Sequence, residues 1–279
     1  MIFKKYKTLS ANGKYAAIKI APSMPKGNPG KKRAKREKPT HEAVVKRNKR
    51  ALTMRLWGLI VSNFEEYDNF ISLTYENGHV PESEEASKDN FRKFKRKLQR
   101  KAKQKGIQLR MIWVTESKSG RPHHHLIINR EVPTELIFEI WHEVKGGKII
   151  RVTLMRQDAG KSPDFYDLAS YMVKEKTTEY NIIQDLNQKA YSRTRNLVLP
   201  ETREENVKRQ EIRVPKGWEL VPGSVEEYID CITGLPYLEY RLMATEPNAN
   251  KRQKRGRKVP ISKVYDLKRL YIEEQLSLL

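Results

Sequence analysis

The chain has a single cysteine, Cys231, and no run of 18 or more apolar residues. One cysteine excludes an internal disulfide and a cysteine-rich zinc site, and it favours a reducing environment. Without a long apolar run the sequence predicts neither a transmembrane helix nor a membrane partner. The amino terminus also lacks the apolar segment of a secretory signal peptide. We therefore expect a cytoplasmic protein.

Acidic residues are also few, because 34 Asp and Glu stand against 56 Lys and Arg and give a formal net charge of +22. Such an excess favours a polyanionic partner, and with membranes set aside nucleic acid is the expected one. The length of 279 residues predicts one main domain with tails. We expect a basic, flexible arm over residues 1–41, a main domain over residues 42–200, and a C-terminal extension of unassigned role over residues 201–279.

Hydrophobic periodicity divides the main domain into alternating helices and strands. Ser87 is the expected N-cap of the second helix and Gly106 its stop signal, while Ser162 and Pro163 are expected to open the last helix. The expected strands cover residues 70–75, 109–115, 123–128 and 148–154, and the expected helices cover residues 42–64, 88–105, 135–143 and 163–176.

A hairpin formed by the second and third of these strands brings together residues that can bind a metal ion. His123 and His125 share one face of a strand, and the preceding strand ends in Glu116. Leu126 and Ile128 have the opposite parity and are expected to face the core, as is His124. Two imidazoles and one carboxylate suit Mg²⁺ or Mn²⁺, although Zn²⁺ or Ni²⁺ would also be accepted.

The last helix offers a nucleophile. Tyr171 and Lys174 are three residues apart and are expected to share a helical face. A phenol has an ordinary pKa of about 10, so it attacks phosphorus only when a nearby cation stabilises the phenolate or the transition state. Metal hairpin and tyrosine together indicate attack on a phosphodiester with a transient protein–DNA bond.

The sequence resembles the HUH endonucleases that initiate rolling-circle replication of small plasmids, phages and related elements. The runs FISLTY (residues 70–75), ESKSGRPHHHLII (116–128) and ASYMVK (169–174) are similar to the family's three motifs, in the family's order. A further run, SRTRNLVLP (192–200), resembles an arginine-containing segment of many bacterial and phage initiators. Position 175 is Glu and position 167 is Asp, so the chain resembles the single-tyrosine enzymes.

The resemblance implies an α+β fold, an antiparallel sheet of about five strands flanked by helices. It further implies nicking and joining of single-stranded DNA at an origin, which can include a hairpin, through a 5′-phosphotyrosine at Tyr171 assisted by Lys174. Host helicase and DNA polymerase would be the partners, and no small-molecule substrate is expected. The candidate DNA-binding residues are Arg92, Lys95, Arg96, Arg121, Arg193 and Arg195.

Two alternatives remain open. A single-tyrosine HUH transposase would carry the same motifs, although such transposases tend to be little more than the catalytic domain. A non-catalytic DNA-binding protein that regulates replication or copy number would explain the basic charge. It would not explain why a Tyr and Lys helix follows a histidine and carboxylate hairpin.

Overall fold

The computed structural model describes residues 2–23, 38–116, 121–144, 146–155, 162–174, 190–246 and 257–260. Within these residues the chain is an α+β protein built on antiparallel sheets, which confirms the predicted fold class. It divides into two compact units. We call the described parts of residues 63–157 and 168–197 the histidine unit, and those of residues 1–62, 158–167 and 198–279 the terminal unit. Among the described helices, none has the length and apolar character needed to cross a membrane.

The histidine unit contains the predicted sheet of five strands. Their spatial order is β6-β3-β5-β4-β7, and every neighbouring pair is antiparallel. The central strand β5 carries all three consecutive histidines. The strand bounds are β3 Asn69–Thr74, β4 Met111–Glu116, β5 His123–Ile128, β6 Ile150–Leu154 and β7 Ser192–Arg193.

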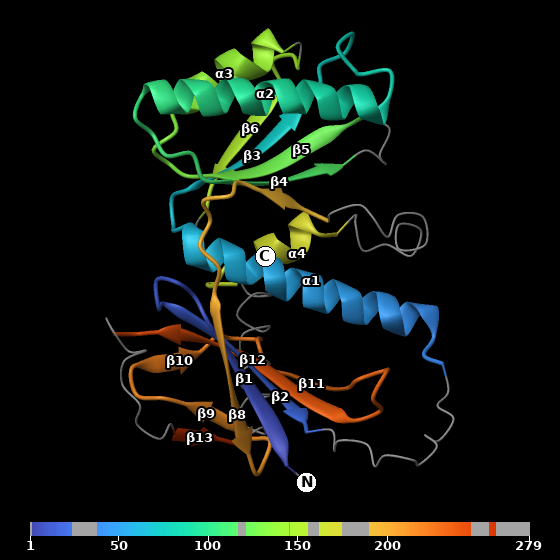
Figure 1. Ribbon diagram of the computed structural model, residues 1–279, viewed down its shortest axis with the longest axis vertical. Helices are drawn as coiled ribbons and strands as arrows, with labels where there is room; N and C mark the ends of the chain where they lie inside the picture. The colour runs from blue at the N-terminus through green and yellow to red at the C-terminus, as the bar shows by residue number, and fades with distance from the viewer. Residues whose placement is uncertain are drawn as a thin grey trace, which may run out of the picture. The chain divides into compact units, whose positions relative to one another are not determined.

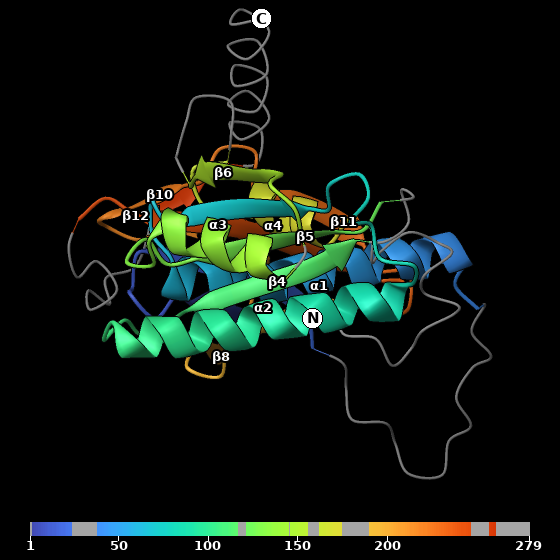
Figure 2. The ribbon, with the colours of Figure 1, turned by 90° about the horizontal axis from the view of Figure 1, so that it is seen from above.

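Helices α2 (Glu84–Gln104) and α3 (Thr134–Glu143) lie over one face of this sheet (Figures 1 and 2). Phe94 of α2 and Trp141 of α3 are fully buried in one core with Leu126 of β5. The helices cover this face because their apolar side chains recur at helical spacing while those of the strand alternate. The opposite face of the sheet is the one that carries the candidate metal ligands.

The ends of α2 differ in part from the expectation. Ser83, not Ser87, is the N-cap, and its hydroxyl accepts a hydrogen bond from the Ala86 N–H at 3.1 Å. Ser87 is instead buried within the helix. The predicted stop is confirmed, because Gly106 follows the helix with φ of 71°, a left-handed conformation that glycine adopts without strain.

Helix α4 (Tyr166–Met172) is shorter than the helix expected over residues 163–176. The prediction of Ser162 as N-cap and Pro163 as first helical residue is wrong. The Ser162 hydroxyl donates to the Asp164 carboxylate and its N–H donates to Asp167 at 2.7 Å, so the segment folds as a turn. Phe165 then has φ of 59°, which postpones the helix to the next residue.

The terminal unit is built on a larger sheet, of order β10-β12-β2-β1-β8, with β11 paired to β12. A two-stranded sheet of β9 and β13 and most of helix α1 (His41–Asn63) complete the unit. The strand bounds are β1 Phe3–Leu9, β2 Tyr15–Pro22, β8 Glu201–Val207, β9 Ile212–Val214, β10 Trp218–Leu220, β11 Glu226–Ile229, β12 Pro236–Ala244 and β13 Arg257–Val259.

The expected flexible arm over residues 1–41 is wrong for residues 3–22. Strand β1 is hydrogen-bonded on both sides, with Lys5 opposite Ile20 of β2 and Glu205 of β8. Strand β8 and the strands after it were expected to form a separate C-terminal extension, yet β8 and β12 share the sheet of the N-terminal strands. Composition missed this sheet because its paired strands are far apart in the sequence. Residues 24–37, which hold the basic run from Lys31 to Arg36, lie outside the described residues.

Candidate metal centre

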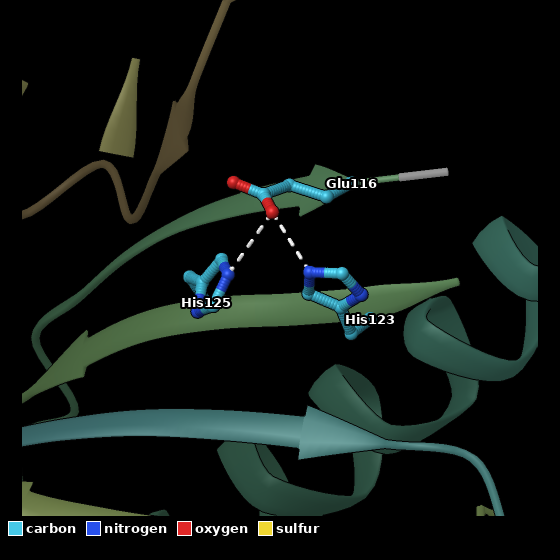
Figure 3. Close-up of side chains that lie close together, drawn as sticks. All are labelled: Glu116, His123 and His125. Carbon is cyan, nitrogen blue, oxygen red and sulfur yellow. Dashed lines mark hydrogen bonds and ion pairs between the residues drawn. The ribbon is translucent and has the colours of Figure 1, made fainter. Parts of the chain in front are cut away.

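Strands β4 and β5 pair so that Glu116 lies directly opposite His123. His125 is two residues further along β5, so all three side chains emerge from the same face of the sheet. One carboxylate oxygen, Glu116 Oε2, lies 2.8 Å from His123 Nε2 and 3.2 Å from His125 Nε2 (Figure 3). One ligand atom from each residue lies within 4.8 Å of the other two. This buried group could therefore hold a metal ion, as the sequence predicted.

Each imidazole is also held by its second ring nitrogen. His123 Nδ1 is 3.0 Å from the carbonyl oxygen of Arg121, and His125 Nδ1 is 2.9 Å from the hydroxyl oxygen of Ser72 on β3. These contacts fix the planes of both rings and turn both Nε2 atoms toward Glu116. Partners of this kind orient histidine ligands in metalloproteins.

The hydrogen-bond pattern provides a test of whether a cation fits. The carbonyl of Arg121 can only accept, so Nδ1 of His123 must carry a proton. Its Nε2 then either carries a second proton, which it donates to the Glu116 carboxylate, or presents a lone pair. A divalent cation between the lone pair and the carboxylate would take the place of that proton. The donor set therefore fits the predicted cation.

Electrostatics keeps Glu116 ionised. Burial by itself would raise the pKa of this carboxyl, but the hydrogen bonds and charges of His123 and His125 outweigh that effect and lower the pKa from 4.5 to about 2. A carboxylate that is charged throughout the physiological range is a suitable ligand for a hard cation.

Tyr171 lies beside this centre. Its hydroxyl oxygen is 3.5 Å from His125 Nε2, and its ring meets the His125 ring edge-on with centroids 5.2 Å apart. The Tyr171 side chain is 46% exposed, so the hydroxyl is accessible from solvent. Helix α4 thus brings the predicted nucleophile to the predicted metal ligands.

Phe70 is a neighbour of the centre that the sequence did not single out beyond its place in the first motif. Its ring stacks on the His125 ring at 5.7 Å with an interplanar angle of 13°, and it meets Tyr171 edge-on at 6.1 Å. Phe70 and Ser72 have the same parity on β3, which is the signal that could have placed both residues on the site face.

Lys174 is not on the helix with Tyr171. Helix α4 ends at Met172, and the Lys174 N–H donates to the Tyr171 carbonyl at 3.1 Å in the turn that follows. The expected shared helical face is therefore wrong, although the turn keeps the two residues adjacent. The Lys174 side chain is exposed.

His124 lies on the other face of the sheet, as its parity predicts. It is fully buried, its ring stacks on Phe91 at 4.4 Å, and its Nδ1 lies 2.9 Å from the Thr115 hydroxyl. Burial, with smaller effects of the neighbouring histidines, lowers its pKa to about 3, so it is a neutral core residue.

The candidate DNA-binding residues fall into three groups. Arg121 donates to the Asn77 side chain beside the metal centre. Helix α2 carries a group in which Arg92 pairs with Glu85 and Asp89, at 3.0 and 2.7 Å, and Lys95 lies over the Trp113 ring at 4.8 Å. The remaining member of this group is the exposed Arg96, and the third group is Arg193 and Arg195 at β7. Trp113 was missed by the sequence analysis.

Comparison with known proteins gives one result. Residues 68–179 match the family model of the replication-associated protein ORF2. This segment includes the hairpin of β4 and β5 and helix α4, and hence Glu116, both candidate histidine ligands, Tyr171 and Lys174. Comparisons with curated proteins and with solved structures find no match.

Proposed function

Because residues 68–179 match the replication-associated protein family, we propose that this chain initiates rolling-circle replication by nicking and rejoining single-stranded DNA at an origin. The observation that carries the proposal is the position of the Tyr171 hydroxyl, 3.5 Å from a histidine that shares its carboxylate with a second histidine. A nucleophile placed beside a cation site is the arrangement that phosphoryl transfer to a side chain requires.

In the proposed reaction the phenolic oxygen of Tyr171 attacks the phosphorus of a DNA phosphodiester. The bond from phosphorus to the 3′-oxygen breaks, a 5′-phosphotyrosine forms, and the phenolic proton is balanced by the proton that the departing 3′-oxygen takes up from water. Attack by a 3′-hydroxyl on the phosphotyrosine reverses the step and rejoins the strand. Because one phosphodiester is exchanged for another, no energy source is needed.

Each residue around the tyrosine has a distinct part in this proposal. Glu116, His123 and His125 would hold Mg²⁺ or Mn²⁺, which when bound polarises the scissile phosphate. Phe70 and His125 confine the tyrosine ring through edge contacts. Lys174 offers positive charge to the phosphate from the adjacent turn. The 3′-hydroxyl would prime a host DNA polymerase on a template unwound by a host helicase.

The test is incubation of the purified chain with a labelled library of single-stranded oligonucleotides and Mn²⁺, followed by denaturing electrophoresis and peptide mass mapping. We expect a covalent adduct on Tyr171 that disappears with chelator and with Tyr171→Phe, while DNA binding is kept. Tyr67→Phe is the matched control, because Tyr67 is an exposed tyrosine of the same unit. DNA binding without an adduct in either Mn²⁺ or Mg²⁺ would favour a non-catalytic regulator, and an adduct that persists in Tyr171→Phe would reject the nucleophile.

A further inference from the structure

A hollow of about 670 Å³ lies at one edge of the sheet of the histidine unit. We call it the tryptophan groove. Trp113 of β4 forms one side, and the edge strand β7 with its flanking residues forms the other. The principal lining residues are Trp113, Tyr191, Ser192, Arg193, Thr194 and Arg195.

The groove is distinct from the metal centre. Trp113 pairs with Leu126 of β5, a core residue beneath α2 and α3, whereas the next residue, Val114, pairs with His125. Because successive side chains of a strand alternate between faces, Trp113 and Glu116 project to opposite faces of β4. A ligand in the groove would therefore not occupy the position of the metal.

Trp113 differs from the other tryptophans of the chain. Trp57, Trp141 and Trp218 are at most 6% exposed, whereas Trp113 is only partly buried. Its ring packs on Phe91 with centroids 5.8 Å apart and contributes to the lining of the groove. A large aromatic ring in a hollow lined otherwise by hydroxyls and guanidiniums is a stacking platform for a planar group.

The charge around the groove has one sign. Arg193 and Arg195 lie in its lining, Lys95 of α2 lies over the Trp113 ring at 4.8 Å, and the lining includes no carboxylate among the described residues. Burial, followed by the like charges of Arg96 and Arg92, lowers the pKa of Lys95, which indicates a local excess of positive charge. Such a surface attracts phosphates.

We propose that the tryptophan groove binds single-stranded DNA, with a base stacked on Trp113 and the flanking phosphates held by Arg193 and Arg195. Aromatic platforms interleaved with cations are how proteins hold single strands without reading their sequence, and a duplex hides the base faces that the platform needs. The proposal rests on the proposed action on single-stranded DNA. The groove holds a part of the strand other than the phosphate at Tyr171, because the two sites use opposite faces of the sheet.

The binding test uses the full chain carrying Tyr171→Phe, in chelator, with an oligothymidylate of about 16 nucleotides. We expect oligothymidylate to quench tryptophan fluorescence, and Trp113→Phe to remove most of that change while keeping the packing. Trp113→Ala should weaken binding about 5- to 150-fold, the range found for loss of one stacked base. Circular dichroism would show whether this variant keeps its fold.

A second variant tests the phosphate contacts independently of the tryptophan. Arg193→Ala with Arg195→Ala should reduce the slope of log affinity against log salt by about 1.4, since each cation that neutralises a phosphate of a single strand contributes about 0.7. The matched control is Arg130→Ala with Arg151→Ala, which also removes two exposed arginines of the same unit, one of them on the opposite edge strand β6. The control should keep the parent slope.

The outcomes separate this proposal from the proposed function. If the groove variants keep the parent affinity, salt slope and fluorescence change while the wild-type chain forms its Tyr171 adduct, the groove proposal fails alone. If the groove variants lose affinity as expected but no adduct forms in any metal, the nicking function fails and the groove proposal holds.

Discussion

The two units of the chain each bury a carboxylate, but the carboxylates have different partners. In the terminal unit Asp164 is fully buried and pairs with Arg241 Nε at 2.5 Å. In the histidine unit Glu116 is nearly as buried and pairs with His123 and His125. A guanidinium stays protonated at any physiological pH, whereas an imidazole can lose its proton and offer a lone pair instead.

The surroundings of the two carboxylates follow the same division. The Arg241 guanidinium lies 3.8 Å from the centre of the Tyr166 ring, and the Trp57 indole N–H donates to the Asp164 carbonyl at 2.9 Å. These contacts fix the Asp164 pair as part of the packing. Glu116 has partners that can exchange a proton for a cation. The comparison teaches that the kind of partner, rather than burial, distinguishes a carboxylate available for chemistry from one that holds the fold.

The largest expected effect concerns the terminal unit. Asp164→Asn leaves the Arg241 guanidinium buried without its counter-charge, so the free energy of unfolding should fall by about 3–5 kcal/mol. Urea denaturation followed by tryptophan fluorescence measures this. The control is Asp89→Asn, which breaks an exposed pair with Arg92 and should cost less than about 1 kcal/mol. Equal losses in the two variants would contradict the structural role of Asp164.

The pH dependence of stability should single out Glu116. In chelator its pKa falls from 4.5 to about 2 on folding, so the ionised form favours the folded state. The stabilisation, on the order of 3 kcal/mol, is complete above about pH 4.5 and is lost as the pH falls toward 2. Unfolding free energies at about pH 5 and about pH 3 measure it. Glu116→Gln should lack this component, and an unchanged dependence in that variant would disprove the assignment.

Activity should depend on Glu116 in the same way. Glu116→Gln removes the anionic donor from the proposed metal site, and nicking should fall by about 100-fold or more. The measurement is the nicking rate as a function of Mn²⁺ concentration. Glu139→Gln, an exposed carboxylate on α3, is the control and should nick at the parent rate. Parent-like nicking by Glu116→Gln would exclude the carboxylate from the site.

The smallest expected effect is at Ser72, whose hydroxyl holds Nδ1 of His125. Ser72→Ala frees the ring to rotate, so the Mn²⁺ concentration for half-maximal nicking should rise about 10-fold. Ser72→Thr keeps the hydroxyl and should restore most of the parent value. A Thr variant as defective as the Ala variant would mean that the hydroxyl is not what positions the histidine.

Within the histidine unit, local patterns predicted much of the fold. The alternation of apolar side chains located β3, β5 and α3 to within one residue at each end. The same alternation placed His124 in the core and its two neighbours on the other face. Patterns failed at Ser162, where a side-chain turn replaced the expected helix cap, and at Lys174, which lies beyond the end of α4.

In the terminal unit, local patterns were of little use. The basic composition near the amino terminus indicated a flexible arm, yet β1 is an interior strand because β8, at the far end of the chain, pairs with it. No periodicity within β1 reveals a partner so distant in sequence. Trp113 was missed for the same reason, because its groove is completed by β7, which is remote along the chain.

The sequence by itself determined which side chains of β5 share a face, that Glu116 ends the preceding strand, and that the chain carries a large positive charge, because these follow from local period and composition. Only the tertiary structure decided that one oxygen of Glu116 meets both imidazoles, that Tyr171 lies over His125, and that the amino-terminal strands belong to a second sheet. Each of these depends on strand register or on the packing of a helix against a sheet. Register and packing are set by contacts between distant segments, and a local pattern does not contain them.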